Sequence, residues 1–157
     1  MPLKALKEYL DSHHIRYELI AHEPTFTSQE TAASAHVPGR ELAKTVIVRL
    51  DGRLAMAVLP ATERVDLDLL RAGTGASEAG IADEEDFRGR FSECETGAMP
   101  PFGNLFGMDV YVDSALEEDG RIAFNAGTHS EVMRMRYRDF ERAVHPRTVH
   151  MAASCAA

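Results

Sequence analysis

Apolar positions near the start of the chain follow two spacings, first that of a helix and then that of a strand. Leucines recur every three or four positions in residues 3–12, which predicts an amphipathic helix that covers one face of the core. Apolar and polar residues alternate over 15–19, which predicts a strand, and Pro24 ends it because proline donates no hydrogen bond to a sheet. Thr27 and Glu30 then have the spacing of a capping box, so we expect a short helix to about residue 35.

The middle of the chain carries the strongest hairpin pattern in the sequence. Two β-rich runs, 44–50 and 53–59, are separated by Asp51-Gly52, a pair typical of a tight turn. Residues 66–72, with acidic residues early and an arginine late, predict a short helix that ends before Gly73. Another short helix is expected to begin near Asp83.

The second half of the chain alternates between a loop and further strands. Residues 97–107 contain two prolines and three glycines, which predicts a loop without regular structure. Strands are expected at 109–113, 121–125 and 132–136, and a closing helix at 139–144. The predicted order, α-β-α-β-β-α-α-β-β-β-α, does not alternate regularly, and this favours an α+β fold over a doubly wound sheet.

Composition limits the chain to one globular domain. The 157 residues are 45% hydrophobic and 27% charged, values near those of ordinary soluble proteins. We expect the domain to span residues 1–150 and residues 151–157 to form a disordered tail of small side chains. No apolar run approaches the roughly 20 residues that cross a bilayer, and the N-terminus lacks a secretory signal, so we expect no membrane association and a cytoplasmic location.

Cysteine, histidine and net charge narrow the possible ligands. With two cysteines, no CxxC pair and no regular histidine spacing, the sequence predicts no disulfide framework, metal or other cofactor. A net charge of -8 argues against a general nucleic-acid binder. Five arginines between Arg134 and Arg147 nevertheless leave room for a local basic patch.

Three local features are candidates for chemistry, although each also has a purely structural explanation. Lys44 begins an apolar strand, where its stem could simply cover apolar surface while the ammonium reaches water. The loop at 97–103 is either a rigid connection or a place where a ligand approaches the backbone. Residues 125–129 supply an amide, a hydroxyl and an imidazole, but they also suit a tight turn between strands. The chain has none of the GxSxG, P-loop, GxGxxG or HExxH motifs.

Taken in order, residues 43–48, 97–103 and 124–127 resemble the YbaK/EbsC family. This family includes freestanding aminoacyl-tRNA deacylases related to the editing insertion domain of bacterial prolyl-tRNA synthetase, and the resemblance covers nearly the whole chain. It implies a mixed, partly barrel-like β-sheet surrounded by short helices. It also implies hydrolysis of the ester that joins a wrong amino acid to the 3′ adenosine. The implied partner is the acceptor end of a mischarged tRNA, alone or held by an aminoacyl-tRNA synthetase.

The resemblance also implies a set of site residues. Lys44 matches the functional lysine of the family, and Gly97 with Pro101 matches its GxxxP loop. Lys44 and Gly97 are therefore the catalytic candidates. The candidates for substrate contact are Thr27, Thr45, Ala98, Met99, Pro101, Asn125, Gly127 and His129.

The chemistry of an aminoacyl ester suits such a set. The ester is already activated, so an enzyme needs mainly to position it, polarise its carbonyl and admit water. Lys44 could hold the carbonyl or a phosphate, with backbone N–H groups of 97–101 stabilising the oxyanion. In the family the vicinal hydroxyl of the tRNA is thought to assist the water. Two alternatives stay open: a non-catalytic aminoacyl- or nucleotide-binding module that regulates a partner, and an esterase for small molecules. The amino acid removed is also open among alanine, serine, threonine, cysteine and proline.

Overall fold

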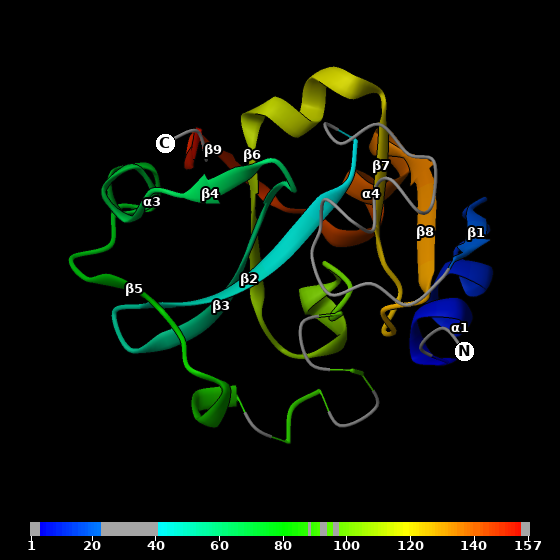
Figure 1. The fold of residues 1–157 in the computed structure, drawn as a ribbon, viewed down its shortest axis with the longest axis horizontal. Helices are drawn as coiled ribbons and strands as arrows, with labels where there is room; N and C mark the ends of the chain where they lie inside the picture. Colours follow the sequence, from blue (N-terminus) through cyan, green and yellow to red (C-terminus); the bar gives the residue numbers. More distant parts are fainter. Residues whose placement is uncertain (1–3, 23–40, 88, 92–93, 96–97, 155–157) are drawn as a thin grey trace.

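The computed structural model describes residues 4–22, 41–87, 89–91, 94–95 and 98–154 (Figure 1). The α-helices in these ranges are α1 (Lys4–Ser12), α3 (Leu67–Thr74) and α4 (Tyr137–Val144). The 3-10 helices are η1 (Glu84–Phe87), η2 (Gly103–Leu105) and η3 (Ser114–Asp119). The strands are β1 (Glu18–Ala21), β2 (Ala43–Leu50), β3 (Arg53–Pro60), β4 (Glu63–Val65), β5 (Ala79–Ile81), β6 (Asp109–Asp113), β7 (Arg121–Asn125), β8 (Glu131–Arg136), β9 (Arg147–Val149) and β10 (Ala152–Ser154).

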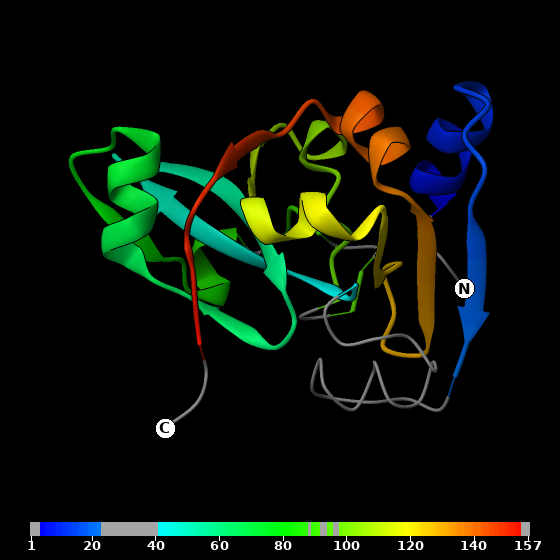
Figure 2. The same ribbon diagram turned by 90° about the horizontal axis from the view of Figure 1, so that it is seen from above.

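The strands form three sheets that meet along β2, β3 and β7. The largest sheet has the order β5-β2-β3-β6-β9, in which β3, β6 and β9 run parallel and the other pairs antiparallel. An antiparallel sheet, β1-β8-β7, lies at the opposite end of the molecule from α3 (Figures 1 and 2). A parallel bridge between Leu42 and Ala123 joins β2 to β7. The expected α+β class, with a mixed sheet and surrounding short helices, is confirmed.

The predicted hairpin is confirmed with its turn. Strands β2 and β3 pair from Ala43–Pro60 to Leu50–Arg53, and the turn residues Asp51 and Gly52 have φ angles of 48° and 84°. Two consecutive positive φ values define the turn that matches the twist of paired strands. The hairpin supplies the central pair of strands of the largest sheet.

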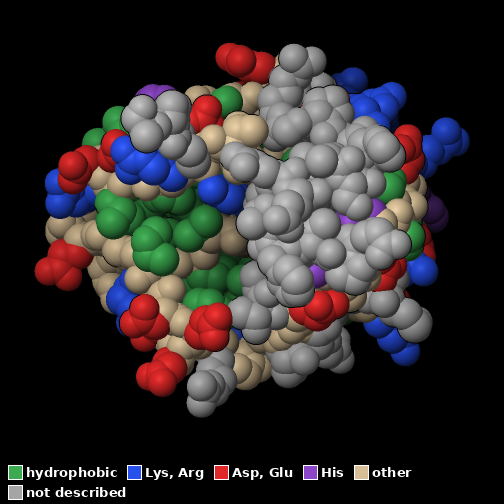
Figure 3. Space-filling model, in the orientation of Figure 1, with side chains coloured by type: hydrophobic (Ala, Val, Ile, Leu, Met, Phe, Trp, Pro, Cys, Tyr) green, Lys and Arg blue, Asp and Glu red, His purple; other side chains and the backbone are tan. Residues whose placement is uncertain are grey.

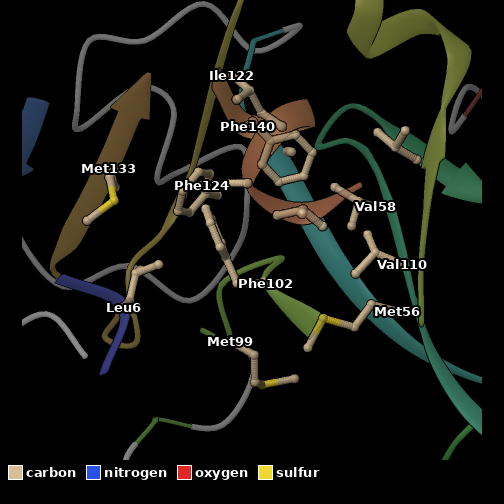
Figure 4. Packing of buried hydrophobic residues seen from close by; sticks show 14 of the residues in the cluster. Leu6, Met56, Val58, Met99, Phe102, Val110, Ile122, Phe124, Met133 and Phe140 are labelled. Atoms are coloured by element: carbon tan, nitrogen blue, oxygen red, sulfur yellow. The ribbon is translucent and has the colours of Figure 1, made fainter. Parts of the chain in front are cut away.

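The main core is built around three phenylalanines from distant parts of the chain (Figure 4). Phe102, Phe124 and Phe140 are each at most 1% exposed, and the Phe102 ring lies 5.5 Å from that of Phe124 and 5.7 Å from that of Phe140. Burying a side chain of this size stabilises a fold by about 1.5–3 kcal/mol. Leu6 and Leu10 of α1 are fully buried in the same cluster, as the leucine spacing predicts.

Phe102 anchors the predicted loop at 97–107 from inside the core. Within this loop, η2 forms one turn of 3-10 helix, so the prediction of no regular structure is wrong for residues 103–105. A Cβ on Gly103 would lie 2.4 Å from the carbonyl oxygen of Met108, so only glycine fits where the loop folds back on itself. The loop is thus held close to β6 and β7, which positions residues 98–101.

Several predicted boundaries differ from the structure. The first strand begins at Glu18 rather than residue 15, and Leu19 is 42% exposed. Helix α3 continues through Gly73 to Thr74 and is capped by Gly75, which has a φ of 75°. A Cβ on Gly73 would lie 3.1 Å from Val149, so the missing side chain lets α3 approach β9 closely. The capping box at Thr27 lies outside the described residues.

The expectation of a disordered tail is wrong for residues 151–154. Met151 is fully buried, and β10 pairs with β4. The buried Asp113 carboxylate holds this segment, since its Oδ1 accepts hydrogen bonds at 2.9 Å from the backbone N–H groups of Met151 and Ala152. None of the helices in the described part of the chain has the length and apolar content that crossing a bilayer requires.

Candidate functional site

Lys44 and Asn125 occupy equivalent places on the two strands that meet at the Leu42–Ala123 bridge. The strands run parallel there, and each residue stands two positions beyond its bridge residue. Side chains two apart on a strand share a face, so Lys44 and Asn125 project from the same side. Past the bridge the two strands diverge (Figure 1).

We call this part of the molecule the β2–β7 fork. It comprises residues 44–46 of β2, residues 125–127 at the end of β7, and Ala98 and Met99 of the preceding loop. Two of the three segments that the sequence singles out for chemistry therefore reach one place through the bridge. The loop joins them through hydrogen bonds.

The loop and the turn after β7 are hydrogen-bonded into one unit. The Gly127 N–H donates to the Ala98 carbonyl at 2.9 Å, and the Glu95 N–H donates to the Gly127 carbonyl at 2.8 Å. Gly127 has a φ of 103°, in the region that favours glycine. The His129 N–H donates to Glu95 Oε1 at 3.4 Å, which extends the same network along the turn.

Lys44 is half-buried between apolar neighbours on its own face of β2. Leu42 on one side is 1% exposed and Val48 further along is fully buried. In the described ranges no carboxylate lies within ion-pairing distance of the Lys44 ammonium. The stem of Lys44 covers apolar surface while its ammonium keeps a positive charge at this place. An anionic or strongly polar ligand group would pair with that charge.

Asn125 carries an unsatisfied oxygen. Its Oδ1 is buried and accepts no hydrogen bond from the described residues. A buried polar atom without a partner costs about 1–3 kcal/mol, and such atoms are rare in native proteins. An N–H or O–H donor on a ligand would satisfy it.

The loop offers fewer oxyanion donors than the sequence suggests. The Ala98 N–H already donates to the Glu95 carbonyl at 3.0 Å, and Pro100 and Pro101 have no N–H. The Met99 N–H donates to no described residue. Of the described residues 98–101, Met99 alone therefore has a backbone donor to spare.

The structure does not place the remaining predicted site residues on the face of the fork that carries Lys44. Thr45 lies on the opposite face of β2 from Lys44, beside Ala43 and Ile47, which belong to the main core. Pro101 is buried, and Thr27 and Gly97 lie outside the described residues. No group of three or more His, Cys, Asp or Glu side chains in the described ranges is arranged to hold a metal ion.

An arginine-lined groove on the β1-β8-β7 sheet is the feature that sequence reasoning missed in part. Arg16, Arg121, Arg134 and Arg136 line it. Arg134 and Arg136 fall in the basic stretch seen in the sequence, whereas Arg16 and Arg121 are distant in the chain and reach the groove only through strand pairing. Alternation within each predicted strand gives the two faces of that strand, but only the pairing of β1, β8 and β7 brings these arginines onto one face of one sheet.

Comparisons with known proteins identify a family and several solved structures with a similar fold. The model of the aminoacyl-tRNA editing domain family matches residues 22–143. No curated protein matches the sequence. The solved structure of the hypothetical protein APE2540 is 20% identical, with a TM-score of 0.84 over 96% of this chain and 100% of that chain.

Two further structures have similar folds. A proposed trans-editing enzyme for prolyl-tRNA synthetase is 16% identical, with a TM-score of 0.80 over 95% of each chain. A proposed signal transduction protein from Marinobacter aquaeolei VT8 is 14% identical, with a TM-score of 0.75 over 97% of this chain but 31% of that one. At these identities the similarity shows the fold alone.

Proposed function

Because the chain belongs to the aminoacyl-tRNA editing domain family, we propose that it is a trans-editing hydrolase that deacylates mischarged aminoacyl-tRNA at the 3′ ester. The observation that carries this proposal is the placement of Lys44 and Asn125 on one face, two residues beyond the Leu42–Ala123 bridge. Among the described residues, Lys44 has no carboxylate at ion-pairing distance and the buried Asn125 Oδ1 has no hydrogen-bond donor. Both features suit a polar ligand.

The reaction needs no protein nucleophile. Water adds to the carbonyl carbon of the ester, and the bond to the ribose oxygen then breaks. One proton of the water goes to the leaving ribose oxygen, the other is released to solvent, and the free amino acid leaves as its carboxylate. Negative charge develops on the carbonyl oxygen in the transition state, so groups that meet it there accelerate the step.

The fork residues divide these tasks by their chemistry. The Met99 N–H is the spare donor for the developing oxyanion, and the Lys44 ammonium adds a positive charge on the fork face for the carbonyl or an adjacent phosphate. Asn125 Oδ1 only accepts hydrogen bonds, so it suits the α-ammonium group of the amino acid or a ribose hydroxyl. Holding the ester by these contacts orients it for water.

The substrate partner in this proposal is the acceptor end of tRNA. A net charge of -8 disfavours contact with a large part of a polyanion. Contact limited to the acceptor end, or delivery by a synthetase that holds the rest of the tRNA, is consistent with that charge.

The test is a deacylation panel. The purified protein is given tRNAs charged with alanine, serine, threonine, cysteine or proline, and ester loss is followed over time. We expect hydrolysis of at least one mischarged tRNA. The Lys44→Ala variant should lose about 100- to 1,000-fold in rate, the usual cost of removing one transition-state contact. Lys7→Ala on the exposed face of α1 is the matched control.

Two results would count against the proposal. No hydrolysis of any tRNA in the panel would favour the non-catalytic binding module. Full activity in a folded Lys44→Ala variant would remove Lys44 from the site. A thermal melt of each variant separates loss of activity from loss of fold.

A further inference from the structure

The outer face of the β1-β8-β7 sheet carries a groove of about 480 Å3 whose lining includes four arginines. Figure 3 shows Lys and Arg side chains gathering at the upper right, over the end of the molecule where β1 and β8 lie. The opposite face of this sheet is apolar, with Ile122 and Met133 fully buried in the main core. On the arginine face, Ala123 and Val132 are fully buried in a small cluster with Leu42, so the groove is confined to the end of the sheet that carries the arginines.

Strand register places three of the arginines in a line across the sheet. Arg121 on β7 lies directly opposite Arg136 on β8, and Glu18 on β1 lies opposite Arg134. Arg16 precedes β1 by two residues, and extending the antiparallel register of β1 and β8 by two positions brings it opposite Arg136. Arg16, Arg136 and Arg121 all line the same groove, and neighbouring strands are about 4.8 Å apart. We call these three residues the arginine row.

Such a line of like charges is unfavourable in the protein alone. Like charges directly opposite each other destabilise a strand pair. Asp139 offsets Arg136 through bonds of 3.0 and 3.3 Å, and Glu41 pairs with Arg134 at 3.2 Å. For the two outer members of the row, Arg16 and Arg121, the described residues provide no carboxylate at ion-pairing distance. Glu18 is the one carboxylate among the described residues that line the groove, so its four arginines leave a net positive charge there on a chain that is acidic overall.

The arginine row lies at a useful distance from the β2–β7 fork. Arg121 and Asn125 are four residues apart on β7 and share a face, which separates them by about 13 Å. A nucleic-acid strand advances about 3.4 Å per nucleotide along a duplex, so this distance corresponds to about four nucleotides. Ala123 lies between Arg121 and Asn125 on the same face and is fully buried in a cluster with Leu42 and Val132, so a tRNA with its 3′ end in the fork would reach the row by passing over this cluster.

We propose that the arginine row, with Arg134 beside it, binds phosphodiester groups of the tRNA acceptor end a few nucleotides from the ester. This inference rests on the proposed function, because that function puts the 3′ end of the tRNA in the fork. Guanidinium groups suit the task because their planar N–H pairs match phosphate oxygens. Each phosphate contact releases counterions, so binding through the row depends on salt.

Binding of uncharged full-length tRNA over a range of salt concentrations tests the row. The double variant Arg16→Gln/Arg121→Gln should bind about tenfold more weakly at moderate salt, and the slope of log K against log salt should fall by roughly 1.4–1.8. The matched control is Arg53→Gln/Arg90→Gln. It removes the same charge from another groove, which Asp86 and Asp109 also line, and should bind like the wild type.

Equal affinity and equal salt slope in the two double variants would overturn the proposal that the arginine row binds tRNA. In the deacylation assay, the row variant should raise KM and leave kcat unchanged, because the row lies away from the ester. The two proposals can fail separately. A wild-type protein that binds tRNA through the row but hydrolyses none of the panel refutes the proposed activity alone. If hydrolysis requires Lys44 but proceeds equally well in the row variant, the proposed role of the arginine row alone is refuted.

Discussion

Replacing Asn125 with alanine should lower activity without lowering stability. The Asn125 Oδ1 atom is buried without a hydrogen-bond donor in the described part of the protein, so the folded state carries its desolvation cost. That cost is about 1–3 kcal/mol, and alanine removes it. The smaller side chain loses some packing, which offsets the gain. We therefore expect the free energy of unfolding to change by less than about 1 kcal/mol.

Activity should respond differently. If Oδ1 accepts a hydrogen bond from a charged or polar substrate group, its loss costs about 1.5–3 kcal/mol in the transition state. This corresponds to a drop in kcat/KM of roughly 10- to 150-fold, at about 1.4 kcal/mol for each factor of ten. The contrast between the two effects distinguishes a ligand-binding amide from a structural one.

Urea denaturation and the deacylation assay, run on the same preparation, measure both effects. Asn104→Ala is the matched control, because Asn104 lies outside the β2–β7 fork and its Nδ2 donates to the Ala143 carbonyl at 3.4 Å. The control should lose up to about 1 kcal/mol of stability and keep full activity. An Asn125→Ala protein that loses about 2 kcal/mol or more, beyond the roughly 1 kcal/mol of a typical hydrogen bond, and retains wild-type activity would show that the amide is structural.

Two other predictions concern stability. Asp113→Ala should lower the free energy of unfolding by about 3 kcal/mol in urea, because Met151 and Ala152 lose their acceptor; an effect below about 1 kcal/mol would contradict this. Burial, and then Glu117, raise the pKa of Tyr137, so the folded state holds the phenol proton more tightly than the unfolded state does. This stabilisation is complete below the unfolded pKa of about 10 and is lost as pH rises above it. The Tm of the wild type should therefore fall more steeply at alkaline pH than that of Tyr137→Phe, and equal slopes would contradict the assignment.

Local chemistry explains which elements the sequence predicts well. The hairpin depends on Asp51-Gly52 and on alternation within two long runs, and both are local properties. Strands β4, β5, β9 and β10 are each three residues long, which is too short for an alternation of apolar and polar side chains to be recognised. Their pairing is decided by distant partners, such as the Asp113 carboxylate that fixes the chain before β10.

The candidate site follows the same division. The segments around Lys44, Gly97 and Asn125 stand out in the sequence, but a shared face for Lys44 and Asn125 requires a bridge between residues 42 and 123. Alternation along β2 would have placed Thr45 on the core side, away from Lys44. The arginine row depends on the register of three strands, which no single segment contains.

The deacylation rate of the Lys44→Ala protein, beside that of the wild type and of Lys7→Ala, decides whether Lys44 acts on the ester. We expect hydrolysis of at least one mischarged tRNA by the wild type and by Lys7→Ala, and a loss of about 100- to 1,000-fold in folded Lys44→Ala. Equal rates in all three proteins would contradict this expectation.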